Sequence, residues 1–211
     1  PVLSKNFLNR GIKGFKKIKD AYYLEHSTSL RMSELGYQPI SQDHLKISVD
    51  SMEDYVRDLL NATQTHSETF QKLFADNKDD NSQINSNVLQ IEDEYYSVAR
   101  PKSSSPTNKR LTSKLMNYGV DYIELRSLDL DPFSRTGIKK ETIDFLEIFI
   151  VFCALTPSLK MSENEIAEIR LNDRLVSTMG RKEDLTLKKG GQDILLKDWA
   201  HQILDNMEKT A

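Results

Sequence analysis

Two residues in the middle of the chain, Glu124 and Arg126, have types and a spacing that suit phosphate and metal chemistry. Side chains alternate along a β-strand, so the extended, apolar stretch 120–130 would place this acid and this base on one face. A carboxylate can ligate a hard divalent cation, and a guanidinium can bind two phosphate oxygens at once. On a solvent-facing strand the same residues would form only a weak ion pair. The spacing alone therefore leaves both interpretations open.

A second stretch, 88–96, repeats this pattern of alternating apolar and polar residues. As a strand it would direct four polar side chains to one face: Gln90, Glu92, Glu94 and Tyr96. If the two polar faces line one cavity, they offer carboxylates for magnesium, a guanidinium for phosphate oxygens, and amide and phenol groups that orient a substrate. The sequence equally allows both faces to meet solvent, as one face of an antiparallel sheet usually does.

The overall composition excludes several classes of protein. The 211 residues carry a net charge of -3, so the chain would not hold polyanions and we expect no nucleic-acid partner. The longest apolar stretch, 145–155, is too short to cross a bilayer and contains Glu147, so we expect no membrane segment. Cys153 is the only cysteine. It allows no internal disulfide, fits a cytoplasmic protein and is expected to be a buried, unreactive thiol.

Familiar nucleotide-binding and catalytic motifs are missing from the sequence. There is no Gly-x-x-x-x-Gly-Lys-Ser/Thr loop, no Gly-x-Gly-x-x-Gly turn and no Gly-x-Ser-x-Gly elbow, so a phosphate would have to be held in another way. The four histidines lack the spacing of metal ligands, and we expect none of them to be catalytic: His26, His44, His66 and His201.

The rest of the pattern predicts the elements that would position these side chains. Capping boxes and helical apolar spacing favour helices, whereas stretches rich in Asn, Asp, Ser and Pro favour loops. We expect helices after Ser51 and Ser162 and over 142–155 and 195–207, and loops over 76–86 and 101–109. The helix over 142–155 is apolar nearly all round, so we expect it to be buried centrally and to end at Thr156-Pro157. The total is an α+β fold, with at least two antiparallel strands and four helices, and it shows no internal repeat.

Five strings in this order resemble the proteobacterial type of glutamate–cysteine ligase. They are TSLRMSELGY at 28–37, QINSNVLQIE at 83–92, RPK at 100–102, YIELRSLD at 122–129, and Asn172 followed by GRK at 180–182. The resemblance covers nearly the whole chain from about Tyr22 onward. It implies that ATP phosphorylates the γ-carboxylate of L-glutamate and that the amine of L-cysteine then displaces the phosphate, with Mg²⁺ as cofactor. This reaction is the first step of glutathione biosynthesis.

The resemblance also implies a role for particular side chains. Arg31 would bind the carboxylate of the cysteine substrate, Tyr37 and Tyr96 would wall its side-chain pocket, Glu124 would ligate magnesium, Arg126 would be catalytic by gripping the transferred phosphate, and Gln90 would contact the nucleotide. Glu92 is a weaker candidate beside Gln90. For Glu124 and Arg126 the implied roles agree with the strand alternation.

The same resemblance implies a fold and indicates how much of a family member this chain represents. The family fold resembles glutamine synthetase, with an antiparallel sheet curved around the substrates and helices covering its outer face, and residues 1–211 would be a single region of that catalytic domain. Family members are much longer, several metal-binding glutamates precede the matching part, and the chain begins with Pro1. We therefore expect this chain alone to be inactive, and the full-length enzyme to be a cytoplasmic monomer.

Two other functions stay open on the sequence. Met179 stands where the family usually has an acidic residue before the Gly-Arg-Lys string, so the chain could belong to a ligase that joins glutamate to another amine. Alternatively it could be a non-catalytic binding module of the same fold. Intact Glu124 and Arg126 argue against such a module.

Overall fold

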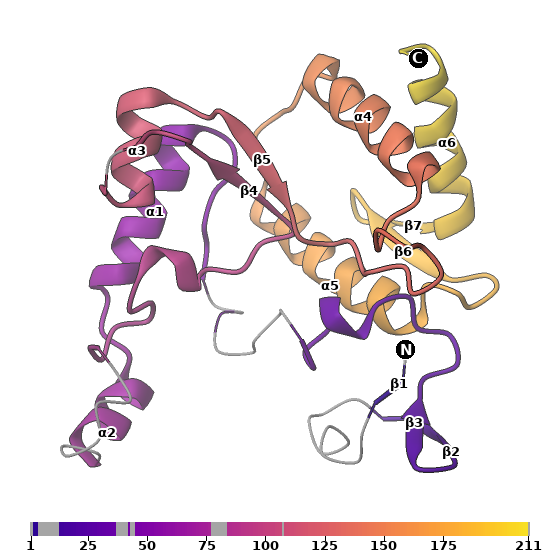
Figure 1. Cartoon of the computed structure of the whole chain (residues 1–211), viewed down its shortest axis with the longest axis horizontal. Coiled ribbons are helices and arrows are strands. Elements are labelled where there is room, and N and C mark those ends of the chain that lie inside the picture. Colours follow the sequence, from indigo (N-terminus) through magenta and orange to yellow (C-terminus); the bar gives the residue numbers. More distant parts are fainter. Residues whose placement is uncertain are drawn as a thin grey trace. The chain divides into compact units, whose positions relative to one another are not determined.

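The computed structural model describes residues 2–3, 13–36, 42, 45–76, 84–106 and 108–210. The chain divides into two compact units (Figure 1): unit 1 is Pro1–Gln38 with Asp129–Ala211, and unit 2 is Pro39–Leu128. Helices are mixed with short antiparallel sheets in these residues, which confirms the expected α+β class. None of the described helices is long and apolar enough to cross a membrane.

Unit 1 combines three long helices with two small sheets. The helices are α4 (Lys140–Leu155), α5 (Glu163–Met179) and α6 (Leu196–Glu208), and a 3₁₀ turn, η2, covers Leu30–Met32. The strands are β1 (Val2–Leu3), β2 (Lys16–Ile18) and β3 (Ala21–Tyr23), ordered β1-β3-β2, and the hairpin of β6 (Thr186–Lys189) and β7 (Gln192–Leu195). As predicted, Ser162 and Glu165 form a capping box at the start of α5.

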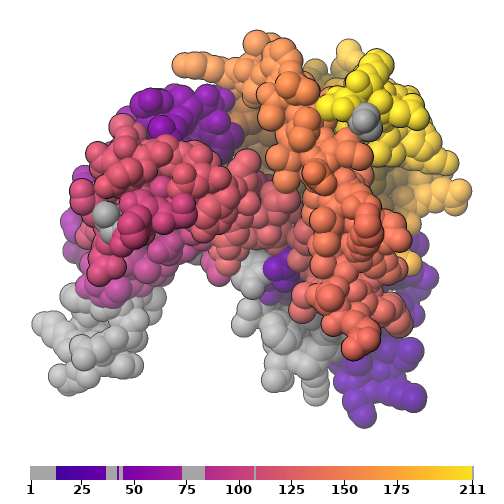
Figure 2. Space-filling model, turned by 45° about the horizontal axis from the view of Figure 1, so that its top comes forward, coloured from indigo at the N-terminus to yellow at the C-terminus, as the bar shows by residue number. Residues whose placement is uncertain are grey.

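The helix α4 has the predicted position but not the predicted burial. It ends at Leu155 with Thr156 as its C-cap, yet none of its residues is buried. Phe145 is 44% exposed and Leu155 is 71% exposed, and Cys153 is also exposed rather than buried. The helix packs against α6 (Figure 1), and it contributes to the orange surface that faces the viewer in Figure 2. A helix that is apolar all round needs cover on every side, and the described residues do not supply it.

Unit 2 contains helices α1 (Met52–Gln64), α2 (Glu68–Asp76) and α3 (Leu111–Tyr118), the 3₁₀ turn η4 (Glu92–Glu94), and the antiparallel pair β4 (Ala99–Lys102) and β5 (Tyr122–Leu125). Its core joins α1, α3 and the segment before η4, where Leu59, Leu89 and Leu115 are completely or almost completely buried. These contacts fix η4 against the helices.

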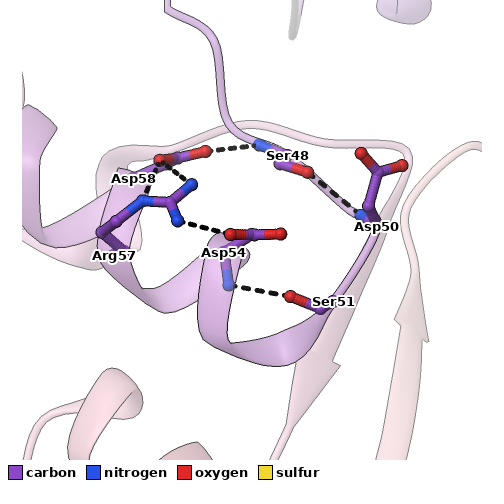
Figure 3. A network of polar contacts seen from close by, with 6 residues as sticks. All are labelled: Ser48, Asp50, Ser51, Asp54, Arg57 and Asp58. Atoms are coloured by element: carbon purple, nitrogen blue, oxygen red, sulfur yellow. Dashed lines mark hydrogen bonds and ion pairs between the residues drawn. The ribbon is translucent and has the colours of Figure 1, made fainter. Parts of the chain in front are cut away.

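The start of α1 shows why this helix begins where the sequence predicts (Figure 3). The side chain of Ser51 accepts a hydrogen bond from the backbone N–H of Asp54 at 3.0 Å, which satisfies one of the free donors of the first turn. Asp58 accepts from the backbone N–H of Ser48 at 3.0 Å, and Arg57 bridges Asp54 and Asp58. The incoming chain is thereby tied to the first two turns of the helix.

Two predicted elements of unit 2 are wrong. The stretch 88–96 is not a strand: it is irregular up to η4, with Asn87 just before it making one isolated bridge to His66. The expected loop 101–109 is partly a strand, because Pro101 and Lys102 belong to β4 and pair with Ile123 and Tyr122. In both places contacts with the rest of the unit outweigh the local preference that the sequence pattern reflects.

Candidate functional site

The strand pair β4–β5 brings Glu124 and Arg126 to one face, as the alternation predicts. Glu124 lies directly opposite Arg100 in the antiparallel register, so the two side chains share a face. Arg126 follows the end of β5, and its backbone N–H donates to the carbonyl of Val98 at 2.9 Å, which continues the pairing by one step. The Arg126 Nε lies 3.8 Å from Glu124 Oε1.

The carboxylate of Glu124 is surrounded by cations but has an oxygen without a hydrogen bond. Lys102 Nζ lies 3.7 Å from Oε2, on the opposite oxygen from Arg126. Within the described part of the chain, this Oε2 is buried and has no hydrogen-bond partner. Leaving a buried carboxylate oxygen unpaired is costly, so the arrangement fits an oxygen that ligates a cation.

A magnesium site would need more than this carboxylate. Among the described residues no group of three or more His, Cys, Asp or Glu side chains could hold a metal ion. Magnesium is commonly held by one or two carboxylates together with water and substrate phosphates, so Glu124 fits as one ligand of such a site. The remaining ligands would have to come from elsewhere.

A cavity of about 400 Å³ in unit 2 collects the other candidates of this unit. Its wall includes Gln90 and Tyr96, together with Asp93 and Glu94 of η4. The guanidinium of Arg126 lies over the Tyr96 ring, 4.9 Å from its centroid, a distance at which a cation is attracted to an aromatic face. The structure therefore brings Gln90, Tyr96, Arg126 and Glu124 into one neighbourhood of unit 2.

Hydrogen bonds fix the wall of this cavity. The side-chain amide of Gln42 donates to the carbonyl of Glu94 at 2.7 Å and accepts from the N–H of Tyr96 at 3.1 Å, so it clamps the turn that carries Tyr96. The backbone N–H of Gln90 donates to Glu94 Oε2 at 2.6 Å, and the Gln90 side-chain oxygen accepts from the N–H of Ile84. The side-chain oxygen of Gln90 is thus already bonded to the backbone, whereas its NH₂ group is the part that could donate to a ligand.

Glu92 does not have the expected position. Its side chain is 5% exposed, and its two oxygens accept hydrogen bonds from the backbone N–H and the hydroxyl of Thr112, at 2.9 Å and 2.7 Å. Thr112 lies in the first turn of α3, where a carboxylate also interacts favourably with the helix dipole. Glu92 therefore caps a helix, and the prediction failed because it assumed the alternation of a strand.

Arg31 belongs to unit 1 and is presented by the turn η2. The neighbouring Leu30 is buried, and the Ser33 hydroxyl donates to the Leu30 carbonyl at 2.6 Å, which holds the turn. Arg31 Nε donates to Asp129 Oδ1 at 2.9 Å while the side chain stays 34% exposed. A Cβ at Gly36 would collide with the carbonyl of Arg31, so only glycine fits there without moving the turn. Tyr37 lies outside the described residues.

Two of the family strings, the one at 28–37 and the one at 180–182, meet at the end of α5. The backbone N–H of Thr28 donates to the carbonyl of Ser177 at 3.1 Å, and its hydroxyl donates to the carbonyl of Val176 at 2.6 Å. A Cβ at Gly180 would lie 2.7 Å from Thr28 Cγ2. The glycine of the Gly-Arg-Lys string thus allows the segment that leads to Arg31 to pack on α5.

Asn172, which belongs to the fifth family string, supports the β6–β7 hairpin. Its side-chain amide donates to the carbonyl of Lys188 at 2.7 Å and accepts from the N–H of the same residue at 2.9 Å. One turn earlier, Glu168 accepts from the N–H groups of Gly190 and Gly191 at 2.9 Å and 2.7 Å. Both residues dock the hairpin on α5.

A family model described as glutamate-cysteine ligase matches residues 1–176. The chain belongs to the glutamate–cysteine ligase family. It is 39% identical over 211 residues to the glutamate–cysteine ligase of Aliivibrio fischeri and 37% identical over 217 residues to that of Alcanivorax borkumensis. These matches cover 98% and 100% of this chain, but only 40% and 41% of the two relatives. The chain therefore spans about two fifths of the length of curated members of the family.

A solved family member has the same fold over the whole chain. The crystal structure of glutamate–cysteine ligase from Francisella tularensis in complex with AMP matches with a TM-score of 0.92 and 35% identity, covering 100% of this chain and 43% of that one. The resemblance seen in the sequence strings is thereby confirmed.

One feature of the site was missed by reasoning from the sequence. Lys102 and Asp93 join the cluster around Glu124, with Lys102 Nζ 3.6 Å from Asp93 Oδ1. The signal was present in the Arg-Pro-Lys string, since alternation from Arg100 places Lys102 on the same face. The prediction missed Lys102 because it assigned residues 101–109 to a loop, where strand alternation does not apply.

Proposed function

We propose that this chain is the phosphate-binding and cysteine-binding part of a glutamate–cysteine ligase, which joins the γ-carboxylate of L-glutamate to L-cysteine at the expense of ATP. Family membership supports the reaction. The observation that carries the proposal for this chain is the carboxylate of Glu124, whose buried Oε2 has no hydrogen bond among the described residues while Arg126 and Lys102 lie beside it. This is an arrangement for binding a cation and a phosphate together.

The proposed roles follow the chemistry of acyl-phosphate formation. A γ-carboxylate oxygen of glutamate attacks the γ-phosphorus of ATP and ADP leaves; the cysteine amine then attacks the acyl carbon, phosphate leaves and the amine gives up a proton. Arg126 grips the phosphoryl group during transfer, restrained by the Tyr96 ring beneath it. Bound Mg²⁺, with Glu124 as one ligand, would neutralise charge on the phosphates.

The acceptor amino acid is assigned to Arg31, Tyr37 and Tyr96. Arg31 provides a guanidinium for the carboxylate of cysteine, and it is half-buried on a turn that Ser33 and Gly36 hold in shape. Tyr37 and Tyr96 wall the side-chain pocket, and Gln90 contacts the nucleotide from the cavity that it shares with Tyr96. These assignments rest on the family strings in which the residues occur.

The wider architecture belongs to the same proposal. Residues 1–211 form one region of a glutamine-synthetase-like catalytic domain whose antiparallel sheet curves around the substrates, and the enzyme acts as a cytoplasmic monomer. Relatives are about two and a half times as long as the part that matches, which is 40% of the Aliivibrio fischeri enzyme. The chain alone is therefore inactive, because further metal ligands would have to come from the rest of such an enzyme.

The test is ADP release by the enzyme at the full length of its relatives, with glutamate and Mg²⁺, comparing cysteine with a panel of other amines. Strong preference for cysteine supports the proposal. Turnover with another amine keeps the ligase but changes its substrate, and no turnover with any amine supports a non-catalytic binding module. Formation of γ-glutamylcysteine by the purified 211-residue chain would contradict its assigned inactivity.

A further inference from the structure

Lys102 has an unusual position in the cluster of charges on the β4–β5 pair. Its ammonium lies 3.6 Å from Asp93 Oδ1 and 3.7 Å from Glu124 Oε2, and its side chain is only 20% exposed. Both distances are longer than a hydrogen bond. Lys102 therefore makes two ion pairs, but no hydrogen bond to any described residue.

Neither carboxylate depends on Lys102 for its counter-ion. Asp93 already accepts a hydrogen bond from the buried guanidinium of Arg100 at 3.2 Å, and Glu124 already has Arg126 beside its other oxygen. Three cationic side chains, those of Arg100, Lys102 and Arg126, therefore lie around the carboxylates of Asp93 and Glu124. Lys102 can therefore turn to an anionic ligand while Arg100 and Arg126 stay as counter-ions of the two carboxylates.

The geometry also shows where such an anion would bind. Lys102 and Arg126 approach different oxygens of the Glu124 carboxylate, so the two cations flank it. A phosphate that shares a divalent cation with Glu124 would come within reach of both side chains. Lys102 then exchanges two long ion pairs for short, charge-assisted hydrogen bonds to phosphate oxygens, which are stronger.

We propose that Lys102 is a second phosphate-binding residue of the site, which binds a nucleotide phosphate oxygen on the side of Glu124 opposite Arg126. This inference rests on the proposed function, because it takes the ligand to be the polyphosphate of ATP or ADP. It assigns a contact with substrate to a residue that would otherwise serve only to connect Asp93 and Glu124.

The experiment compares Lys102→Met, which removes the charge and keeps most of the length, with Lys102→Arg, which keeps the charge. Lys109→Met is the matched control, because Lys109 is exposed in the same unit. Asp93→Asn removes the other ion pair of Lys102 and tests whether Lys102 acts only through Asp93. All variants are made in the enzyme at the full length of its relatives, and binding of ADP with and without Mg²⁺ is measured by calorimetry beside steady-state kinetics.

We expect Lys102→Met to weaken ADP binding and to lower kcat/KM for ATP roughly 10- to 100-fold, the loss typical of a hydrogen bond to a charged group. The KM for cysteine should stay unchanged, Lys102→Arg should recover most of the loss, and Lys109→Met should behave as wild type.

Three results would overturn the assignment: equal ADP binding by Lys102→Met and wild type, equal losses for Lys109→Met, or the same loss of ADP binding from Asp93→Asn. The proposed function fails separately, if wild type releases no ADP with any amine. The calorimetry still decides the role of Lys102 in that case, since it needs no turnover.

Discussion

The guanidinium of Arg126 lies over the ring of Tyr96, with its central carbon 4.9 Å from the ring centroid. The two residues occur thirty positions apart, and the sequence pattern allows them to line one cavity without requiring it. The ring supports the guanidinium on one side, and the Arg126 Nε lies 3.8 Å from Glu124 Oε1. Tyr96, which is assigned to the cysteine pocket, is therefore in contact with Arg126, which is assigned to the phosphate.

We expect Tyr96→Leu to weaken phosphate binding as well as cysteine binding, because it removes the surface that orients Arg126. A cation–π contact of this kind is worth about 0.5–2 kcal/mol, so kcat/KM for ATP should fall by roughly 2- to 30-fold. Tyr96→Phe keeps the ring and is the control: it should retain the ATP parameters. If Tyr96→Leu changes only the KM for cysteine, the contact with Arg126 has no role in positioning.

The two glutamates Glu124 and Glu92 should respond differently to the same substitution. Glu124→Gln should raise the Mg²⁺ concentration needed for half-maximal activity, because it weakens a ligand without changing shape. Glu92→Gln should leave the Mg²⁺ requirement unchanged and lower stability by about 1–3 kcal/mol, since an amide cannot accept from both donors of Thr112. Magnesium titrations and thermal melts of both variants make the comparison. A higher Mg²⁺ requirement in Glu92→Gln would instead indicate that Glu92 is a metal ligand.

Residues whose positions depend on local pattern were predictable. The capping serines Ser51 and Ser162 mark real helix starts, and alternation around Glu124 correctly paired it with Arg126 on one face. These features depend on neighbours within a few positions, which the sequence displays directly.

The predictions that were wrong depend on contacts between residues far apart in the sequence. Glu92 looks like a member of a polar strand face, but its partner Thr112 lies twenty positions away on a helix. Cys153 lies in an apolar run that predicts burial, yet burial depends on what covers α4. Alternation applies only where a strand forms, and an apolar face is buried only where another segment packs on it.

The docking of the β6–β7 hairpin can be tested at Asn172. Asn172→Asp keeps the size of the side chain but loses the donor to the Lys188 carbonyl and faces that carbonyl with a second oxygen. Because this position is buried, we expect a loss of about 1–3 kcal/mol in the free energy of unfolding, measured with urea. Asn206→Asp, on the exposed surface of α6, is the matched control and should change stability by less than about 0.5 kcal/mol. Equal effects would mean that the clamp contributes little.

Asp173, next to this clamp, should make the stability of the chain depend on pH. Burial raises the pKa of its carboxyl above the ordinary value, because the charged form is poorly solvated there. The unfolded chain therefore loses this proton at a lower pH than the folded chain does. Stability is highest below the ordinary pKa and falls as pH rises through the interval up to the raised value, after which it stays level.

Asp173→Asn removes this ionisation, so the variant should be more stable than wild type at neutral pH, and the difference should shrink towards zero as the pH approaches 4. Thermal melts of both proteins from pH 4 to 8 measure the difference directly. Asp205→Asn makes the same charge change on an exposed position of α6 and should not reproduce the trend. A stability difference that is constant across this range would show that Asp173 keeps its charge in the folded chain, and that its surroundings solvate the carboxylate as well as water does.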